Sequence, residues 1–423
     1  MINFSGRFRG LPSLRPCVAA VILLACGASP RIARDRPTAA ATPPTPSGRL
    51  WVVAPHPDDE VLMAGELLRA AVRADRPLSV LVMTNGDLSC ARDGHVRQAE
   101  TISALAALGV TEDSVYFLGY PDGWLDALGP VPLDPLPRTQ PDGACGTGDH
   151  TYASRGMGAA DLHTTRTGEA GAYVADGPVD DLAWLLLRER PTEIVTAHGI
   201  DTHPDHAMTY VYVRRAIERA AIEAPLILRS LVHQGPCWPN GGGAPPCPDV
   251  RTTRGSPFPA LAAPLADYAP GLRVASDDLG STKRDAIARY VSQLETAIAD
   301  ESWLSSFARA DEVFWPERPE VDPDAATRVV LEGSAGTAAI TDEVTLVVDE
   351  GGVTLRDGER TLGQLPIPHG EAASDTHRYE VLVDRRPVEG PFVELTVRRD
   401  GVLWMSGLTR ARTPETGATR DPR

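Results

Sequence analysis

The stretch that decides the fold reads WVVAPHPDDE and spans residues 51–60. It overlaps an uncharged apolar run, residues 50–54, which is long enough for a buried parallel strand. Two prolines then end the strand, because proline has no N–H to donate to a sheet. Residues 60–73 place apolar side chains at helical spacing. The turn between strand and helix, where open α/β sheets bind ligands, is expected to hold four ionisable residues: His56, Asp58, Asp59 and Glu60.

The three carboxylates of this turn would repel one another unless something neutralises them. A bound divalent cation would do so; the alternative is a helix N-terminus whose acids only favour the helix dipole. A second cluster, HGIDTHPDH at residues 198–206, favours the cation. It follows a strand-like run at 193–197 and precedes a helical pattern at 208–221, so both clusters are expected at one edge of the sheet. Three histidines and two aspartates suit zinc bound through nitrogen and oxygen.

Together, PHPDDE at residues 55–60 and HPDH at 203–206 resemble the LmbE/PIG-L family of zinc-dependent de-N-acetylases. That family includes deacetylases of N-acetylglucosaminyl-phosphatidylinositol and of the mycothiol precursor. The resemblance covers about residues 49–315. It implies removal of an N-acetyl group from an N-acetylglucosamine-type sugar or glycoconjugate, with release of acetate. Shorter matches lie at TNGD (84–87), RQAE (97–100), LGYPDG (118–123) and from Lys283 to Gln293.

The resemblance also implies a metal centre. Its ligands would be His56, Asp59 and His206, and its metal Zn2+, although other divalent transition metals accept the same donors. Asp58 matches the family's general base, which takes a proton from the attacking water. Glu60 is expected to cap the helix or to support His56.

Other site residues are implied in the same way. His203 matches the residue that stabilises the oxyanion or protonates the leaving amine, and Asp205 would orient it. Arg97 and Asp122 match positions that bind the substrate, although Arg97 could equally be a surface charge. His198 is an alternative candidate ligand, but it is expected to support the residues that bind the metal rather than to bind the metal itself.

The order of the patterns predicts a Rossmann-like α/β fold, with a mainly parallel sheet and helices on both faces. Strand patterns at 78–84 and 114–118 flank a helical pattern at 94–108, and residues 283–307 read as one long helix. No Gly-x-Gly-x-x-Gly follows the first strand, so a nucleotide cofactor is not expected. The Gly- and Pro-rich residues 126–172 are either part of the cleft wall or a surface insertion.

A different pattern begins after a Pro-rich linker at residues 316–325. Short alternating runs and hairpin turn signals predict a small all-β, sandwich-like domain over residues 326–411. This domain carries no catalytic cluster. Residues 412–423 are expected to be a disordered tail.

The N-terminus predicts export. Residues 1–26 read as a secretory signal, with arginines followed by a short apolar run. The run ends in LLACG, which resembles a bacterial lipobox, so lipidation of Cys26 would anchor the protein to the membrane of the cell envelope. The alternative is an ordinary signal peptide and a secreted protein. Residues 27–48 are expected to be a disordered tether between the membrane and the enzyme.

The net charge and the cysteines bear on the partners and the disulfides of the protein. The 423 residues carry a formal net charge of −16, which argues against a nucleic-acid partner. Four cysteines remain after the signal, and Cys90 with Cys145 and Cys237 with Cys247 are one of three connectivities for two disulfides. Two other functions stay open: a zinc amidase on another acyl-amine, and a non-catalytic glycan-binding lipoprotein.

Overall fold

The computed structural model separates the chain into two units, residues 1–45 and 46–423, and all of the described residues lie in the second. The signal peptide, Cys26, nearly all of the tether and the C-terminal tail lie outside the described residues and stay predictions, as do the domain boundaries. None of the helices in the described residues has both the length and the apolar character that a membrane span requires. The described residues are 48–88, 90–133, 148–235, 238–239, 256–259, 261, 265–294, 301–317, 326–341, 343–384 and 392–410.

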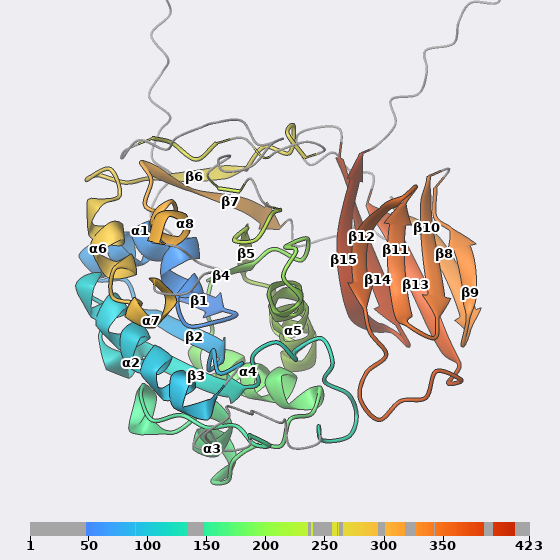
Figure 1. The fold of residues 1–423 in the computed structure, drawn as a ribbon, viewed down its shortest axis with the longest axis horizontal. Coiled ribbons are helices and arrows are strands. Elements are labelled where there is room, and N and C mark those ends of the chain that lie inside the picture. The colour runs from blue at the N-terminus through green and yellow to red at the C-terminus, as the bar shows by residue number, and fades with distance from the viewer. Residues whose placement is uncertain are drawn as a thin grey trace, which may run out of the picture. The chain divides into compact units, whose positions relative to one another are not determined.

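A seven-stranded sheet forms the centre of the α/β region (Figure 1). Its strands lie in the order β3-β2-β1-β4-β5-β7-β6, and the first five of these are parallel. Strands β7 and β6 join antiparallel at one edge. The predicted mainly parallel sheet is therefore confirmed. The strands are β1 (Leu50–Ala54), β2 (Leu78–Thr84), β3 (Val115–Tyr120), β4 (Glu193–Ala197), β5 (Leu226–Ser230), β6 (Leu272–Ala275) and β7 (Asp311–Glu317).

Helices cover both faces of this sheet, as the sequence predicts. Trp51 and Val53 of β1 pack in the same apolar core as α4 and α5, whereas Val52 packs with α1 and α2. This alternation follows from the two-residue period of a strand. The longer helices are α1 (Asp59–Arg73), α2 (Ala91–Ala107), α4 (Asp176–Glu189) and α5 (Pro204–Ala220); the shorter ones are α3 (Leu162–Thr167), α6 (Ser281–Ile287), α7 (Val291–Leu294) and α8 (Glu301–Ser305), with 3-10 turns at Glu112–Ser114 and Met157–Ala159.

The single long helix predicted over residues 283–307 is wrong. Three short helices occupy the described part of that stretch, and the chain leaves the helical path after Ala288. The break has a physical reason. It buries Tyr290 completely and brings its hydroxyl to Glu60, 2.6 Å away, a contact that helical periodicity cannot reveal.

Two four-stranded antiparallel sheets follow, in the orders β12-β11-β10-β9 and β15-β14-β13-β8. They confirm the predicted all-β region, and the hairpin between β14 and β15 turns at Asp400 and Gly401, both with positive φ. Arg229 of β5 bonds Glu394 of β14 at 2.7 and 3.1 Å. The strands are β8 (Ala326–Gly333), β9 (Gly336–Ala339), β10 (Val344–Asp349), β11 (Gly352–Asp357), β12 (Arg360–Leu365), β13 (His377–Asp384), β14 (Phe392–Arg399) and β15 (Val402–Arg410).

Of the four cysteines expected to pair, Cys90 is buried. The other three lie outside the described residues, so the pairing stays a prediction. Residues 134–147 of the predicted insertion also lie outside them.

Candidate metal centre

The turn after β1 places the first cluster at the carboxyl edge of the sheet. Thr84 at the end of the neighbouring strand donates its N–H to Pro55 O at 3.0 Å, which fixes the turn to β2. Asp58 precedes α1 with φ 126° and ψ −35°, a conformation that costs free energy for any residue with a Cβ. Glu60 Oε2 accepts the Asp58 N–H at 3.0 Å, and Tyr290 donates to the other oxygen of the same carboxylate. Glu60 therefore holds the main chain of Asp58 rather than the ring of His56.

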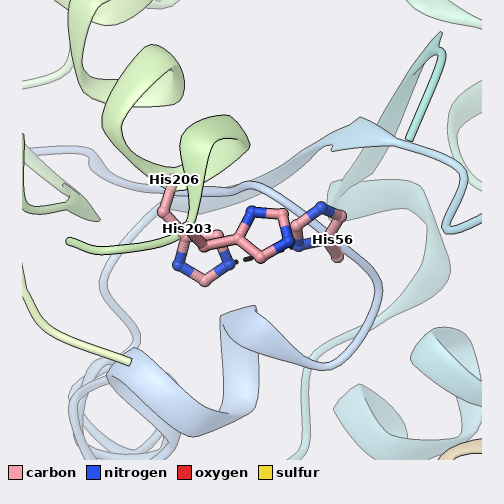
Figure 2. A group of neighbouring side chains, drawn as sticks. All are labelled: His56, His203 and His206. Atoms are coloured by element: carbon pink, nitrogen blue, oxygen red, sulfur yellow. Dashed lines mark hydrogen bonds between the residues drawn. The ribbon is translucent and has the colours of Figure 1, made fainter. Parts of the chain in front are cut away.

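Three donor atoms converge beside this turn. His56 Nδ1 lies 3.1 Å from Asp59 Oδ2 and 3.2 Å from His206 Nε2, and His206 Nε2 lies 3.1 Å from the same Asp59 oxygen. In a tetrahedral zinc site with bonds of about 2.1 Å, neighbouring donors lie about 3.4 Å apart. The three atoms therefore fit one small divalent cation. Figure 2 shows both imidazole rings, with His206 at the start of α5.

The opposite nitrogen of each ring faces a carboxylate. His56 Nε2 lies 3.0 Å from Asp205 Oδ2 and 3.1 Å from Asp122 Oδ1, and His206 Nδ1 lies 3.4 Å from Asp201 Oδ2. A carboxylate behind a histidine fixes which nitrogen carries the proton and leaves the other free for a metal. The carboxylates at the opposite nitrogens are therefore a second observation, independent of the donor distances, that fits a metal centre.

The electrostatics of the cluster point the same way. Burial alone would lower the pKa of His206, but Asp59 and Asp201 raise it to about 10. Burial also opposes the rise in the pKa of His56, which the carboxylates around it place well above its ordinary value. The pocket thus favours positive charge at the place where the two rings meet, and a cation can take the role of these protons.

Asp58 lies next to the donors and bonds Arg97. Its Oδ2 accepts from Arg97 Nη2 at 3.0 Å, while burial raises the pKa of Asp58 to about 8 against the opposing charge of that guanidinium. Arg97 also donates to Pro57 O and Gly86 O, and its Nη1 lies 3.7 Å from Asp122 Oδ2. Since Arg97 is only 9% exposed, it is not a surface charge.

His203 and Asp205 are arranged differently from the prediction. The Asp205 carboxylate does not orient His203, because it accepts the N–H groups of Gly123 and Leu125 and contacts His56. The main-chain N–H of Asp205 instead donates to His203 Nδ1 at 3.2 Å, as part of the N-cap of α5. Burial, together with the neighbouring histidines, lowers the pKa of His203 to about 4. His203 also has a ring nitrogen within 4.8 Å of nitrogens of both His56 and His206, so it is a further candidate donor.

His198 lies away from the donors. Its Nε2 meets Tyr268 Oη at 2.9 Å in a buried contact, and burial, with Arg229 adding to it, lowers its pKa well below the ordinary value. His198 is therefore no rival ligand in this arrangement. Asp201, to which the sequence assigned no role, has one: it contacts His206 and accepts the N–H groups of Val232 and His233.

A cavity of about 800 Å3 opens over the cluster. Its lining includes Trp303, which stacks on His233 at a ring separation of 5.1 Å. No sequence motif marked either residue. The lining residues already described as part of the cluster are His56, Asp58, Asp59, Arg97, Asp122 and His203. None of the described residues of 126–172 lines the cavity, so the cleft-wall expectation for that stretch finds no support. The apolar or aromatic lining residues are Leu62, Leu88, Val96, Trp238, Trp303 and Leu304.

The family model for PIG-L, described as GlcNAc-PI de-N-acetylase, matches residues 51–217. The match therefore covers the part of the chain that carries both clusters. A Mycobacterium protein (strain KMS) named 1D-myo-inositol 2-acetamido-2-deoxy-alpha-D-glucopyranoside deacetylase is 31% identical over 196 residues, which are 42% of this chain and 52% of that protein. A Frankia casuarinae protein of the same name, numbered 2, is 30% identical over 202 residues, 44% of this chain and 54% of that protein. The chain thus spans about half the length of these curated relatives.

Solved structures similar to the chain include two deacetylases. One is the N,N'-diacetylchitobiose deacetylase from Pyrococcus horikoshii, at 16% identity and a TM-score of 0.37 over 64% of this chain and 84% of that one. The other is the zinc-inhibited form of the teicoplanin deacetylase Orf2, at 19% identity and a TM-score of 0.38 over 65% and 99% of the two chains.

The range that matches the PIG-L model contains His56, Asp59 and His206, but not all of the residues that surround them. Tyr290, Trp303 and Lys283 lie beyond residue 217, outside the matched range. Tyr290 holds Glu60, Trp303 lines the cavity, and Lys283 is buried against α1. The site is therefore completed by a part of the chain that the family match does not cover.

Proposed function

We propose that the chain is a metal-dependent hydrolase that removes the N-acetyl group of an N-acetylated amino sugar or glycoconjugate. The observation that carries this proposal is the cluster of donors on His56, Asp59 and His206, 3.1–3.2 Å apart and beside the buried carboxylate of Asp58. The names of the curated relatives supply the substrate class, an N-acetylglucosamine-type sugar.

Zinc is the proposed metal, held by His56 Nδ1, Asp59 Oδ2 and His206 Nε2. When bound, a divalent ion of this kind polarises the amide carbonyl and makes water a better nucleophile at neutral pH. Asp122 and Asp205 keep a proton on His56 Nε2, and Asp201 keeps one on His206 Nδ1, so that the other nitrogens stay free.

Asp58 accepts a proton from the water that attacks the amide carbon. The water oxygen forms the new C–O bond, the C–N bond breaks, and the proton passes to the departing amine, so acetate and a free amino sugar result. Arg97 fixes the Asp58 carboxylate at 3.0 Å and balances its charge. General-base catalysis needs the unprotonated carboxylate. Burial favours the protonated form of Asp58, whereas the Arg97 guanidinium favours the unprotonated form.

The proposed role of His203 is to stabilise the oxyanion. Because its Nδ1 accepts the main-chain N–H of Asp205, the neutral ring carries its proton on Nε2. With its pKa lowered to about 4, the ring is neutral at ordinary pH and can donate that proton in a hydrogen bond to the developing negative charge. Its place in the lining of the cavity supports this role.

The test is acetate release by purified residues 27–423 from a panel of N-acetylated saccharides, with and without chelator. Release that chelator abolishes and added zinc restores is the expected result. If the protein binds zinc but releases acetate from no saccharide of the panel, the proposed substrate becomes another acyl-amine. Failure to bind any divalent metal would end the proposal.

We also propose that the protein is exported and anchored by lipid at Cys26, on the sequence of residues 1–27 alone. Metabolic labelling with a radioactive fatty acid should mark the wild type and not Cys26→Ser. Equal labelling of both proteins would contradict the anchor.

A further inference from the structure

The helix that carries Asp59 is broken one turn after it starts. Within α1, Ala64 has φ −141° and ψ 21°, outside the helical range, and it is fully buried. In a regular helix the N–H of Glu66 would donate to Leu62 O, and the N–H of Leu67 to Met63 O. Broken hydrogen bonds inside a protein must find other partners, because buried unpaired main-chain groups are costly.

A buried ion pair supplies those partners. Lys283 Nζ donates to Leu62 O at 2.8 Å and to Glu312 Oε1 at 2.6 Å. The Glu312 carboxylate accepts the N–H of Glu66 at 2.8 Å and that of Leu67 at 3.0 Å. Both charged side chains are at most 1% exposed. The Lys283 ammonium thus bonds the carbonyl that the break frees, and the Glu312 carboxylate bonds the two N–H groups that it frees. The ion pair therefore replaces the hydrogen bonds of the missing turn.

The contact is tight on the helix side as well. Gly65 directly follows the break, and a Cβ added there would lie 3.1–3.4 Å from the Cγ, Cδ and Cε atoms of Lys283. Glycine therefore leaves room for the lysine stem to cross the helix. Neither partner reaches the metal donors, and Lys283 comes from α6, far along the chain from α1.

We propose that Lys283 and Glu312 are positioning residues of the site. They hold α1 broken at Ala64 and so fix the short segment 59–63, which carries Asp59, against His56 and His206. This inference rests on the proposed metal-dependent function for its effect on catalysis. The structural part of the inference, that the ion pair replaces the turn, is independent of the proposed function.

The test uses Lys283→Met with Glu312→Gln, a double variant that leaves no unpaired buried charge. The matched control is Arg76→Met with Glu193→Gln, a double variant that neutralises another buried ion pair, with a separation of 3.3 Å, near the other end of α1. Two quantities are measured on each protein: Co2+ affinity with the visible absorption of the bound ion, and hydrogen exchange of residues 59–67.

The Lys283/Glu312 double variant is expected to bind Co2+ about 10- to 100-fold more weakly, with a changed absorption spectrum, as when groups that orient metal ligands are lost. Residues 59–67 should also exchange faster than in the Arg76/Glu193 control. A folded Lys283/Glu312 double variant that matches the Arg76/Glu193 control in both measurements would overturn the proposal. If the wild type binds no Co2+, the proposed function fails instead. Hydrogen exchange of residues 59–67 then decides alone whether Lys283 and Glu312 hold the break in α1.

Discussion

The carboxyl edge of the seven-stranded sheet and the two C-terminal sheets bury opposite kinds of side chain. At the sheet edge, the buried groups are ionisable and crowd together, among them His56, Asp58, Asp59, Asp205 and His206. In the described residues after 326, the buried side chains are mostly aliphatic, and the buried polar ones are Thr354, Arg399 and Thr409. Both sets of side chains are buried, but burial of the aliphatic side chains is favourable, whereas burial of the ionisable ones is costly.

The difference indicates what each region is for. Taking carboxylates and imidazoles out of water costs several kcal/mol per charge unless partners repay it. A structure that tolerates this cost at one edge of its sheet needs those groups for chemistry. Among the described residues of the C-terminal sheets, Arg399 is the one buried charged side chain, and it pairs with Glu371. Substitutions in the two regions should therefore damage different properties, and the predictions below separate them.

The largest expected effect is on metal affinity. Asp59→Asn removes the one anionic donor of the cluster and should weaken zinc binding by more than about 100-fold, beyond what loss of a ligand's supporting group costs. Isothermal titration with Zn2+ measures it. The control is Asp93→Asn, the same change at a partly exposed position on the cavity lining. Equal zinc affinity in the two variants would remove Asp59 from the ligand set.

The next effect is on the chemical step. Asp58→Asn keeps the shape of the side chain and its contact with Arg97 but cannot accept a proton. We expect kcat to fall by about 100- to 10,000-fold, the usual contribution of a general base, while zinc affinity changes little. Acetate release measured beside zinc titration checks both. Unchanged kcat would show that another group takes the proton.

Local sequence predicted much of this architecture, because short-range patterns specify it. Residues 50–60 contain a complete strand, a turn and a helix start, and β1, its turn and α1 follow. Parallel order then places the second cluster at the same edge, where the structure brings His206 to His56. The hairpin at residue 400 is likewise decided by two turn residues. The roles assigned to the donors stay predictions.

What the sequence could not predict depends on contacts between distant segments. Helical periodicity extends through Tyr290, yet a bond to Glu60 across 230 positions ends the helix there. Asp205 was expected to orient its near neighbour in the sequence, but its carboxylate faces inward to His56. Trp303 and His233 form a cavity wall from two segments that carry no motif. In each case tertiary packing overrides a local rule.

In the C-terminal sheets, the effect should fall on stability alone. Leu395 is fully buried in β14, so Leu395→Ala leaves a cavity and should cost about 2–5 kcal/mol of the free energy of unfolding. Zinc affinity should not change. Urea unfolding and zinc titration measure the two quantities, and Thr396→Ala, its half-buried neighbour, is the control. A drop in zinc affinity for Leu395→Ala would show that the two regions are coupled.

The smallest effect tests whether a hydroxyl far from the donors tunes the base. Tyr290→Phe removes the bond to Glu60, whose carboxylate holds the unfavourable backbone of Asp58. One neutral-to-charged hydrogen bond is worth about 1.5–3 kcal/mol, and only part of it should reach the reaction, so we expect kcat to fall about three- to tenfold with KM unchanged. The control is Tyr116→Phe, which removes a comparable bond to Glu189. A similar loss of kcat in both variants would mean that the hydroxyl only stabilises the fold, whereas a loss confined to Tyr290→Phe would place Glu60 in the support of Asp58.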